Sequence, residues 1–381
     1  MSVTAAQGFV ATGLEIGLKN SGGKDLAIVQ NLGPTKAAAV VFTSNRAKAN
    51  PIIWSQQVIA DGVVEAIILN SGGANCYTGA QGFQVTHATA EAVAEKLGVS
   101  SGDVLVCSTG LIGDQLPLDK ILVGIEKAEL STTGGEDASE AILTTDSHPK
   151  RTVVKGDGWT IGGMAKGAGM LAPGLATMLV VITTDAVVDS ATLDASLRAA
   201  TRVTFDRLDS DGCMSTNDQV TLMASGASGV LPSAAEFAAA VKQVCDELAQ
   251  LLQEDAEGSS HDIVIETVNA ATEDDAVEVG RAVARNNLFK AAVFGNDPNW
   301  GRVLAAIGTT SAPFDPYAVD VSMNGVMLCR SGEPGESRDL VDLSPRRVHV
   351  LIDLKAGSET ATIRTNDLTH DYVHENSAYS S

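Results

Sequence analysis

Hydrophobic residues are distributed along the chain in two patterns, short continuous runs and helically spaced positions, and together they predict a mixed α and β protein. The runs are rich in β-branched residues and are bounded by Gly, Asn or Pro, which is typical of buried strands. The predicted strands are residues 26–30, 37–42, 64–69, 104–107, 178–183, 263–268, 318–323, 347–354 and 359–364. A further pair, residues 152–155 and 159–162, predicts a hairpin that turns at Gly156, Asp157 and Gly158.

Apolar positions at helical spacing predict helices between these strands. Gly98 ends the first of them, and Ser233 and Glu236 form a capping box that opens another. The predicted helices are residues 85–97, 118–128, 193–203, a helix beginning after Ser233, residues 274–286, and one helix beyond Arg302. The elements interleave without a strict βαβ rhythm, which favours α+β or mixed α/β layers over a doubly wound parallel sheet.

Composition and charge narrow the function. The chain has 381 residues and a formal net charge of −21. Such a charge repels the phosphates of nucleic acids and of anionic membranes, so neither is expected as a partner. Five cysteines without a CxxC spacing predict neither a disulfide framework nor a zinc site and favour a reducing compartment. Six histidines show no paired ligand spacing, so we expect no metal site. The N-terminus lacks the pattern of a signal peptide, and a cytoplasmic location is expected.

A glycine-rich segment runs from Lys166 to Thr177 and leads into the predicted strand at 178–183. Three glycines and a proline in its twelve residues argue against a regular element. Lys166 is the single charge between residues 159 and 184, and it could hold a carboxylate or point to water. The glycines do not follow the order of a phosphate-binding P-loop.

Thr177 could act as a nucleophile if the bond before it breaks. Its hydroxyl could attack the carbonyl of Ala176, and the freed α-amine could serve as the base, because the pKa of such an amine is ordinarily about 7.7–8.0. Taken alone, the same residues also fit an ordinary junction between a loop and a strand.

Two other positions are candidates for chemistry. Backbone amides and a hydroxyl at Thr109 and Gly110, directly after a strand, could form an oxyanion hole, although Ser/Thr-Gly after a strand is very common and usually forms an ordinary turn. Glu257 follows a long helix, where an acidic loop is usually only solvated.

Together, these segments resemble the ornithine acetyltransferase family, the glutamate N-acetyltransferases of the cyclic arginine pathway. The resemblance spans nearly the whole chain and keeps the family order. The matching segments are residues 107–113, 143–146, 162–170, 175–179, 215–218, 255–258, 294–302 and 376–381.

The resemblance implies self-cleavage between Ala176 and Thr177, which gives chains 1–176 and 177–381 with Thr177 as the nucleophile. It implies that Thr109 and Gly110 stabilise the oxyanion. It also implies a set of residues that bind the amino-acid substrate, namely Thr144, Lys166, Thr177, Glu257, Asn376 and Ser381.

The implied reaction moves acetyl from N2-acetylornithine to glutamate without a cofactor, and some family members also use acetyl-CoA. The implied fold is a layered α/β/β/α sandwich with a smaller C-terminal α/β domain, which we assign to residues 1–280 and 281–381. The cleaved halves are expected to assemble as two α and two β chains.

Two alternatives remain at this point. A hydrolase with an N-terminal nucleophile, such as an aminopeptidase or amidase, would share Thr177 but would not need Lys166, Glu257 or the 376–381 tail. A non-catalytic protein would never cleave. The sequence also departs from the family pattern, with Ser259, Ser260 and His261 beside Glu257, with Gly73 in place of the usual asparagine, and with serine rather than threonine at 381.

Overall fold

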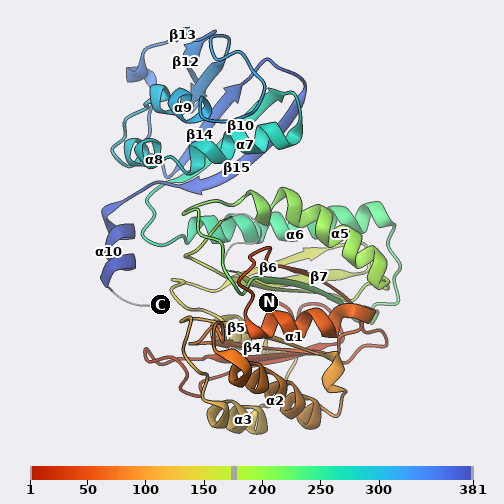
Figure 1. The fold of residues 1–381 in the computed structure, drawn as a ribbon. Coiled ribbons are helices and arrows are strands. Elements are labelled where there is room, and N and C mark those ends of the chain that lie inside the picture. Colours follow the sequence, from red (N-terminus) through yellow and green to blue (C-terminus); the bar gives the residue numbers. More distant parts are fainter. Residues whose placement is uncertain (1, 173–177, 379–381) are drawn as a thin grey trace.

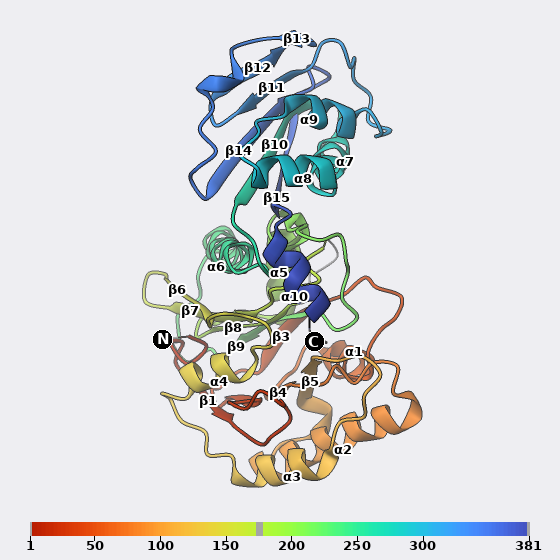
Figure 2. The same cartoon turned by 90° about the vertical axis from the view of Figure 1, so that its left-hand side faces the viewer.

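Two β-sheets lie face to face in the first two thirds of the chain, and helices cover the outer side of each (Figures 1 and 2). The structure is a computed structural model, and it describes residues 2–172 and 178–378. One sheet has the order β1-β2-β4-β5 and the other the order β3-β9-β8-β7-β6. The strands of the first are β1 (Phe9–Leu14), β2 (Leu26–Asn31), β4 (Ala66–Ser71) and β5 (Val104–Thr109). Those of the second are β3 (Ala37–Phe42), β6 (Lys150–Lys155), β7 (Thr160–Lys166), β8 (Leu179–Thr184) and β9 (Gln219–Ala224).

The central strands are apolar on both faces because each face meets a different core. Ile67 and Leu69 of β4 point into the core between the sheets, which also contains Val181 of β8. Ile68 of β4 points to the outer helices, and Val180 of β8 does the same on the other side. This alternation follows from the two-residue period of a strand. Continuous apolar runs are therefore the expected signature of these layers.

Helices form the two outer layers. α2 (Gly79–Leu97) and α3 (Leu118–Lys127) cover the four-stranded sheet, while α5 (Ser190–Val203) and α6 (Ala234–Glu254) cover the five-stranded one (Figure 1). The shorter α1 (Asn50–Val58) packs against β5 and α2, and α4 (Gly135–Ala141) packs on β1 and β2. The predicted α/β/β/α layering is thus confirmed.

The remainder of the chain forms a mixed sheet of its own, with the order β13-β12-β11-β14-β10-β15. Its strands are β10 (Asp262–Ala270), β11 (Asp320–Met323), β12 (Val326–Arg330), β13 (Glu333–Pro334), β14 (Arg347–Asp353) and β15 (Glu359–Asn366). Its helices are α7 (Glu273–Ala284), α8 (Asn287–Phe294) and α9 (Trp300–Ile307). The boundary assigned at 280/281 falls within α7, and α7 and β10 share one core with the strands that follow. The division into domains stays a proposal, and we place its boundary before β10.

The last described helix, α10 (His370–Ala378), leaves this C-terminal unit and runs down along the side of the sandwich (Figures 1 and 2). Its first residue, His370, contacts Phe294 of α8 edge-to-face, with ring centroids 5.4 Å apart. Gly258, in the loop after α6, lies so close to α10 that a Cβ there would be 2.2 Å from the Tyr372 backbone nitrogen. α10 therefore links the C-terminal unit to the edge of the sandwich.

Several local predictions are confirmed. β6 and β7 pair as an antiparallel hairpin. The Ser233 side chain accepts a hydrogen bond from the Glu236 backbone while the Glu236 carboxylate accepts one from Ser233, so the capping box is present. Residues 167–172, the described part of the glycine-rich segment beyond β7, contain no helix or strand.

Other predictions gave the wrong bounds for an element, and several helices and strands were not predicted. The strand predicted at 64–69 lies at 66–71, because the Val64 backbone N–H donates to Lys36 outside the ladder. α2 begins at Gly79, before the apolar spacing becomes visible. Two helices, α9 and α10, occupy the region where one was predicted. The strands and α-helices absent from the prediction are β1, β9, β12, β13, α1, α4 and α8.

No helix in the described ranges has the length and apolar character needed to cross a lipid bilayer.

Candidate functional site

Six residues singled out in the sequence line one small cavity of about 80 Å³. They come from the end of β5, the loop after α4, the end of β7, the loop after α6, and α10. The lining residues are Thr109, Gly110, Thr144, Thr145, Lys166, Gly169, Met170, Glu257 and Asn376. Ala176, Thr177 and Ser381 lie outside the described residues, so their predicted roles stay predictions.

Lys166 is the buried cation of this cavity. Its side chain is 1% exposed, and its Nζ donates to the Thr144 hydroxyl at 2.7 Å and to the Thr109 hydroxyl at 3.4 Å. It is the last residue of β7 and pairs with Leu179, the first residue of β8. Of the two readings left open by the sequence, the side chain therefore points into the protein and not to water.

Asp146 lies beneath Lys166, and its side chain is fully buried. Its carboxylate accepts backbone N–H groups from Thr144 at 3.0 Å and from Gly167 at 2.6 Å. It also pairs with Lys150 at 2.6 Å and lies 3.9 Å from the Lys166 Nζ. Burial acts to raise the pKa of Asp146, but Lys166 and Lys150 outweigh it and lower this pKa to about 2. Asp146 is therefore an anion at neutral pH.

Lys150, at the start of β6, has a side chain with no exposed surface. Besides Asp146, its Nζ binds Asp255 at 2.6 Å, and Asp255 comes just after α6. Removing a charge from such a pair is costly, because the partner would remain buried and unpaired. The loop that carries Thr144 and the loop that carries Glu257 are thereby joined.

The turn after β5 requires glycine. Gly110 has φ +129°, and a Cβ there would lie 2.5 Å from the backbone nitrogen of Gly73. The N–H groups of Gly72 and Gly73 both donate to the Thr109 carbonyl at 2.9 Å. Gly73, one of the departures from the family pattern, is thus part of the support of this turn.

Glu257 and Asn376 meet on the other side of the cavity. The Asn376 side-chain amide donates to the Glu257 carboxylate at 3.0 Å, and the Glu257 backbone N–H donates to Ala168 at 3.0 Å. A Cβ at Gly169 would lie 2.6 Å from both carboxylate oxygens of Glu257. The glycine at 169 therefore leaves the space that Glu257 occupies.

The unusual residues after Glu257 face away from it. Both the Ser260 backbone N–H and the His261 Nδ1 bond to Asp367, at 2.9 and 2.7 Å. The His261 Nε2 lies 2.9 Å from the Leu343 carbonyl. This departure from the family pattern fastens the loop to the C-terminal unit and leaves Glu257 in the cavity.

Asp218, just before β9, is buried next to the start of β8. Its carboxylate accepts the Met178 backbone N–H at 3.0 Å, and burial raises its pKa well above the usual range. Neither Asp218 nor Asp146 was a predicted site residue, although each closes a matching segment, 215–218 and 143–146. Lys150 lies outside every matching segment, and no pattern in the sequence marks it.

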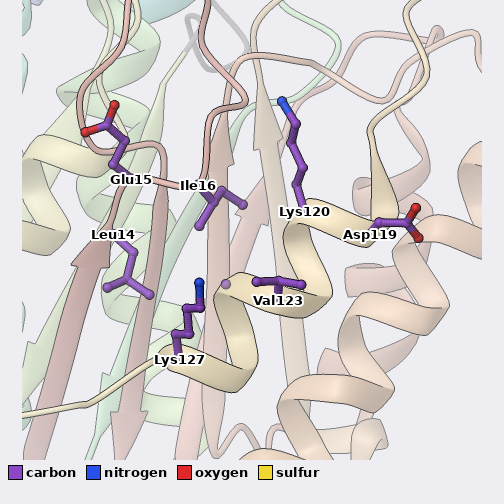
Figure 3. A pocket seen from close by; sticks show the side chains of 8 residues that line it. Leu14, Glu15, Ile16, Asp119, Lys120, Val123 and Lys127 are labelled. Atoms are coloured by element: carbon purple, nitrogen blue, oxygen red, sulfur yellow. The ribbon is translucent and has the colours of Figure 1, made fainter.

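A larger cavity of about 400 Å³ lies elsewhere, between the end of β1 and α3 (Figure 3). Leu14, Ile16 and Val123 supply its apolar wall. The charged ends of its other side chains do not converge on one point, as Figure 3 shows for Glu15, Asp119, Lys120 and Lys127. It contains none of the residues singled out in the sequence.

Across residues 2–172 and 178–378, no three or more His, Cys, Asp or Glu side chains are grouped as a metal ion would require.

Comparison with known proteins identifies the family. The model of the ArgJ family matches residues 10–381. The arginine biosynthesis bifunctional protein ArgJ of Streptomyces avermitilis is 66% identical, and that of Thermobifida fusca is 58% identical, each over the full length of both chains. The crystal structure of ornithine acetyltransferase complexed with ornithine from Mycobacterium tuberculosis is 51% identical and covers 47% of this chain and 96% of that chain, with a TM-score of 0.45. The chain belongs to the ArgJ family.

Proposed function

We propose that this chain is a glutamate N-acetyltransferase of arginine biosynthesis, which moves acetyl from N2-acetyl-L-ornithine to L-glutamate through an acetyl-Thr177 intermediate. The products are L-ornithine and N-acetyl-L-glutamate. The full-length match to the ArgJ family and to relatives named for arginine biosynthesis supports the pathway. The observation that carries the chemistry is one cavity that joins the Thr109–Gly110 turn to a cation, Lys166, and an anion, Glu257.

In the first half of the reaction, the Thr177 hydroxyl attacks the acetyl carbonyl of the donor. The Thr177 α-amine takes the hydroxyl proton, and the Thr109 hydroxyl and the Gly110 backbone N–H donate to the oxyanion. One such donor contributes roughly 2.7–4 kcal/mol to the barrier. The C–N bond then breaks, the proton passes to the leaving nitrogen of ornithine, and acetyl remains as an ester on Thr177.

In the second half, the neutral α-amine of glutamate attacks this ester. Its proton passes through the Thr177 α-amine to the Thr177 oxygen as the ester bond breaks. N-acetylglutamate leaves, and the enzyme returns to its starting form. No cofactor takes part, because both steps exchange only an acyl group and a proton.

The two charges of the cavity suit α-amino acids of this kind. Lys166 is buried beside Thr109, so we assign it to the α-carboxylate next to the reacting nitrogen. Glu257 is half-buried and bonded to Asn376, so we assign it to the distal ammonium of ornithine. The Asn376 amide nitrogen donates to Glu257 and to the Tyr372 carbonyl, both at 3.0 Å, which uses its two N–H groups. We therefore assign the Asn376 side-chain oxygen to the ornithine ammonium and the Ser381 hydroxyl to the distal carboxylate of glutamate.

The same threonine cleaves the chain. Attack of the Thr177 hydroxyl on the Ala176 carbonyl, with loss of the peptide bond, gives an ester that water hydrolyses to chains 1–176 and 177–381. We propose that two copies of each assemble, and that the enzyme works in the cytoplasm on these small molecules.

The test of cleavage is the mass of the purified protein under denaturing conditions, which should give the two chains. Thr177→Ala should remain intact and inactive, whereas Thr177→Ser retains a hydroxyl and should still cleave. A fully active but uncut chain would refute the mechanism. Cleavage that persists in Thr177→Ala would point to another nucleophile.

The test of transfer is incubation with N-acetylornithine alone, which should add one acetyl group to the 177–381 chain. Initial-velocity lines should then be parallel, as in a ping-pong mechanism. Intersecting lines and no adduct would argue for direct transfer. A hydrolase would instead release acetate at a rate independent of glutamate, and the family match does not favour that alternative.

Relatives of this chain are named bifunctional, which supports acetyl-CoA as a second donor. We expect acetylornithine to be the better donor, because Lys166 is the sole cation among the described lining residues and coenzyme A carries several phosphate charges. Comparison of kcat/KM for the two donors with glutamate checks this. Equal values would contradict the preference.

A further inference from the structure

Four side chains form a line of alternating charge beneath the cavity. Lys166, Asp146, Lys150 and Asp255 follow one another at 3.9, 2.6 and 2.6 Å between charged atoms. Their side chains are between 0% and 7% exposed. The acetyl-transfer steps described above use only the first of them.

The two carboxylate oxygens of Asp146 have different partners. One carboxylate oxygen accepts the Thr144 N–H and faces Lys166, and the other accepts the Gly167 N–H and the Lys150 ammonium. The backbone on both sides of the Lys166 ammonium is thus tied to one carboxylate. Displacement of Asp146 would move the Thr144 hydroxyl and the Lys166 ammonium together.

Lys150 extends the connection to the other side of the cavity. Asp255, its second partner, is two residues before Glu257. The Lys150 ammonium therefore joins the loop that holds Thr144, the hydrogen-bond partner of Lys166, to the loop that holds Glu257. Lys166 and Glu257 are the two groups assigned to opposite ends of the substrate.

We propose that Asp146 and Lys150 are positioning residues of the acetyl-transfer site, which fix Lys166 and Thr144 and act on the charge of Lys166 in opposite directions. This inference rests on the proposed role of Lys166 as the binder of the substrate α-carboxylate.

The ionisable groups that face Lys166 come from four segments. Burial lowers the pKa of Lys166, Asp146 raises it, and Lys150 lowers it further, while Asp218 and Glu257 raise it. Loss of the Asp146 charge should therefore make Lys166 lose its proton at a lower pH. Loss of the Lys150 charge should make Lys166 keep its proton to a higher pH.

The experiment measures KM for glutamate from neutral to alkaline pH in the full, self-processed enzyme. In the wild type, KM should rise where Lys166 loses its proton. Asp146→Asn should move this rise to lower pH by about one unit or more. Lys150→Met should move it to higher pH, by a smaller amount because Lys150 acts from farther away. The Thr177 α-amine titrates in every variant and cancels in the comparison.

Matched controls separate positioning from general damage. Lys24 also bridges two carboxylates, Asp137 and Glu140, at 2.5 and 2.6 Å, but it is partly exposed and outside the cavity. Lys24→Met should keep the wild-type profile. Asp146→Glu and Lys150→Arg retain the charges and should keep the wild-type pH of the rise. Thermal unfolding of each variant reports whether it is folded.

The outcomes discriminate clearly. The proposal is supported if the pH at which KM rises shifts in opposite directions in Asp146→Asn and Lys150→Met. Shifts in the same direction, or a uniform rise of KM without a shift, overturn it. If Asp146→Asn or Lys150→Met does not fold, the charge-retaining variants decide, and a displaced rise in either one refutes the proposal. Lys166→Met tests the proposed function separately, since an unchanged KM for glutamate there would refute the carboxylate role itself.

Discussion

Two cavities of the sandwich show that volume alone does not identify a functional site. The cavity over α3 is about five times larger, with about 400 Å³ against about 80 Å³, and its charged groups stand apart at the surface (Figure 3). The smaller one is lined by Lys166, whose side chain is 1% exposed, and Asp146 lies beneath it with a side chain that is 0% exposed and accepts hydrogen bonds from several segments. Burial of paired charges costs free energy, so it is expected where the charges serve a function.

The difference predicts where substitutions matter. A surface charge is screened and mobile, so its loss changes little. A buried charge that is held in place by several hydrogen bonds is little screened by solvent, so its loss should weaken ligand binding strongly.

Lys166→Met should lower kcat/KM for acetyl transfer about 100-fold, because a charge-assisted bond to the substrate is worth about 1.5–3 kcal/mol. The matched change in the larger cavity, Lys127→Met, should leave kcat/KM unchanged within about twofold. Steady-state kinetics with acetylornithine and glutamate measure both. Equal effects of the two changes would remove the distinction between the cavities.

Acid should lower the stability of the protein through Asp146, beneath the small cavity, but not through Asp119 in the larger one. The pKa of Asp146 is about 2 in the folded protein against a usual value of 3.8, so its contribution is present above pH 3.8 and is lost as pH falls toward 2. The free energy of unfolding should decrease by about 2 kcal/mol over this range from this group. Asp146→Asn should reduce this acid dependence, and Asp119→Asn in the larger cavity should not. Denaturant titrations at several acidic pH values check this, and identical slopes in the three proteins would contradict it.

Glu257→Gln should raise KM for acetylornithine about tenfold, because an ammonium would meet a neutral amide instead of a carboxylate. KM for glutamate should change less, since its distal group is an anion. Varying each substrate in turn measures the split. A similar rise for both would refute the assignment of Glu257 to the ornithine ammonium.

Gly169→Ala should raise KM for acetylornithine several-fold, roughly the effect of a misplaced ion pair. The new Cβ would approach both Glu257 oxygens at 2.6 Å, so the carboxylate must move. Gly102→Ala, whose Cβ would meet one hydroxyl at 3.3 Å, is the control and should behave as the wild type. An unaffected Gly169→Ala would mean that Glu257 has freedom to adjust.

Much of the layered fold could be predicted, because apolar runs and helical spacing report burial directly. The hairpin of β6 and β7 and the capping box at Ser233 are local patterns, and both are present. α1 and α4 were missed because they are short, with only nine and seven residues. The strand order could not be predicted from the sequence. β3 pairs with β9 across more than 170 residues, and no local pattern encodes such a pairing.

The candidate site, too, could be predicted only in part. The sequence identified Lys166 and Glu257 as candidates, but it could not tell that the lysine is buried. Lys150 shows why, because its burial depends on Asp255, 105 residues away. A lysine in a polar stretch is indistinguishable from a solvated one until both of its carboxylates are placed. The roles of Thr177 and Ser381 stay predictions.

The strand order of the five-stranded sheet bears on the timing of the proposed cleavage. β8 and β9 lie between β3 and β7, so a break between 176 and 177 leaves two middle strands in one piece and the strands on either side of them in the other. Neither piece could complete this sheet alone, and each would present unpaired edges prone to aggregation. If the proposed cleavage occurs, folding must therefore precede it during biosynthesis. Once denatured, the mature enzyme should recover far less activity on dilution than the uncut Thr177→Ala chain recovers native structure.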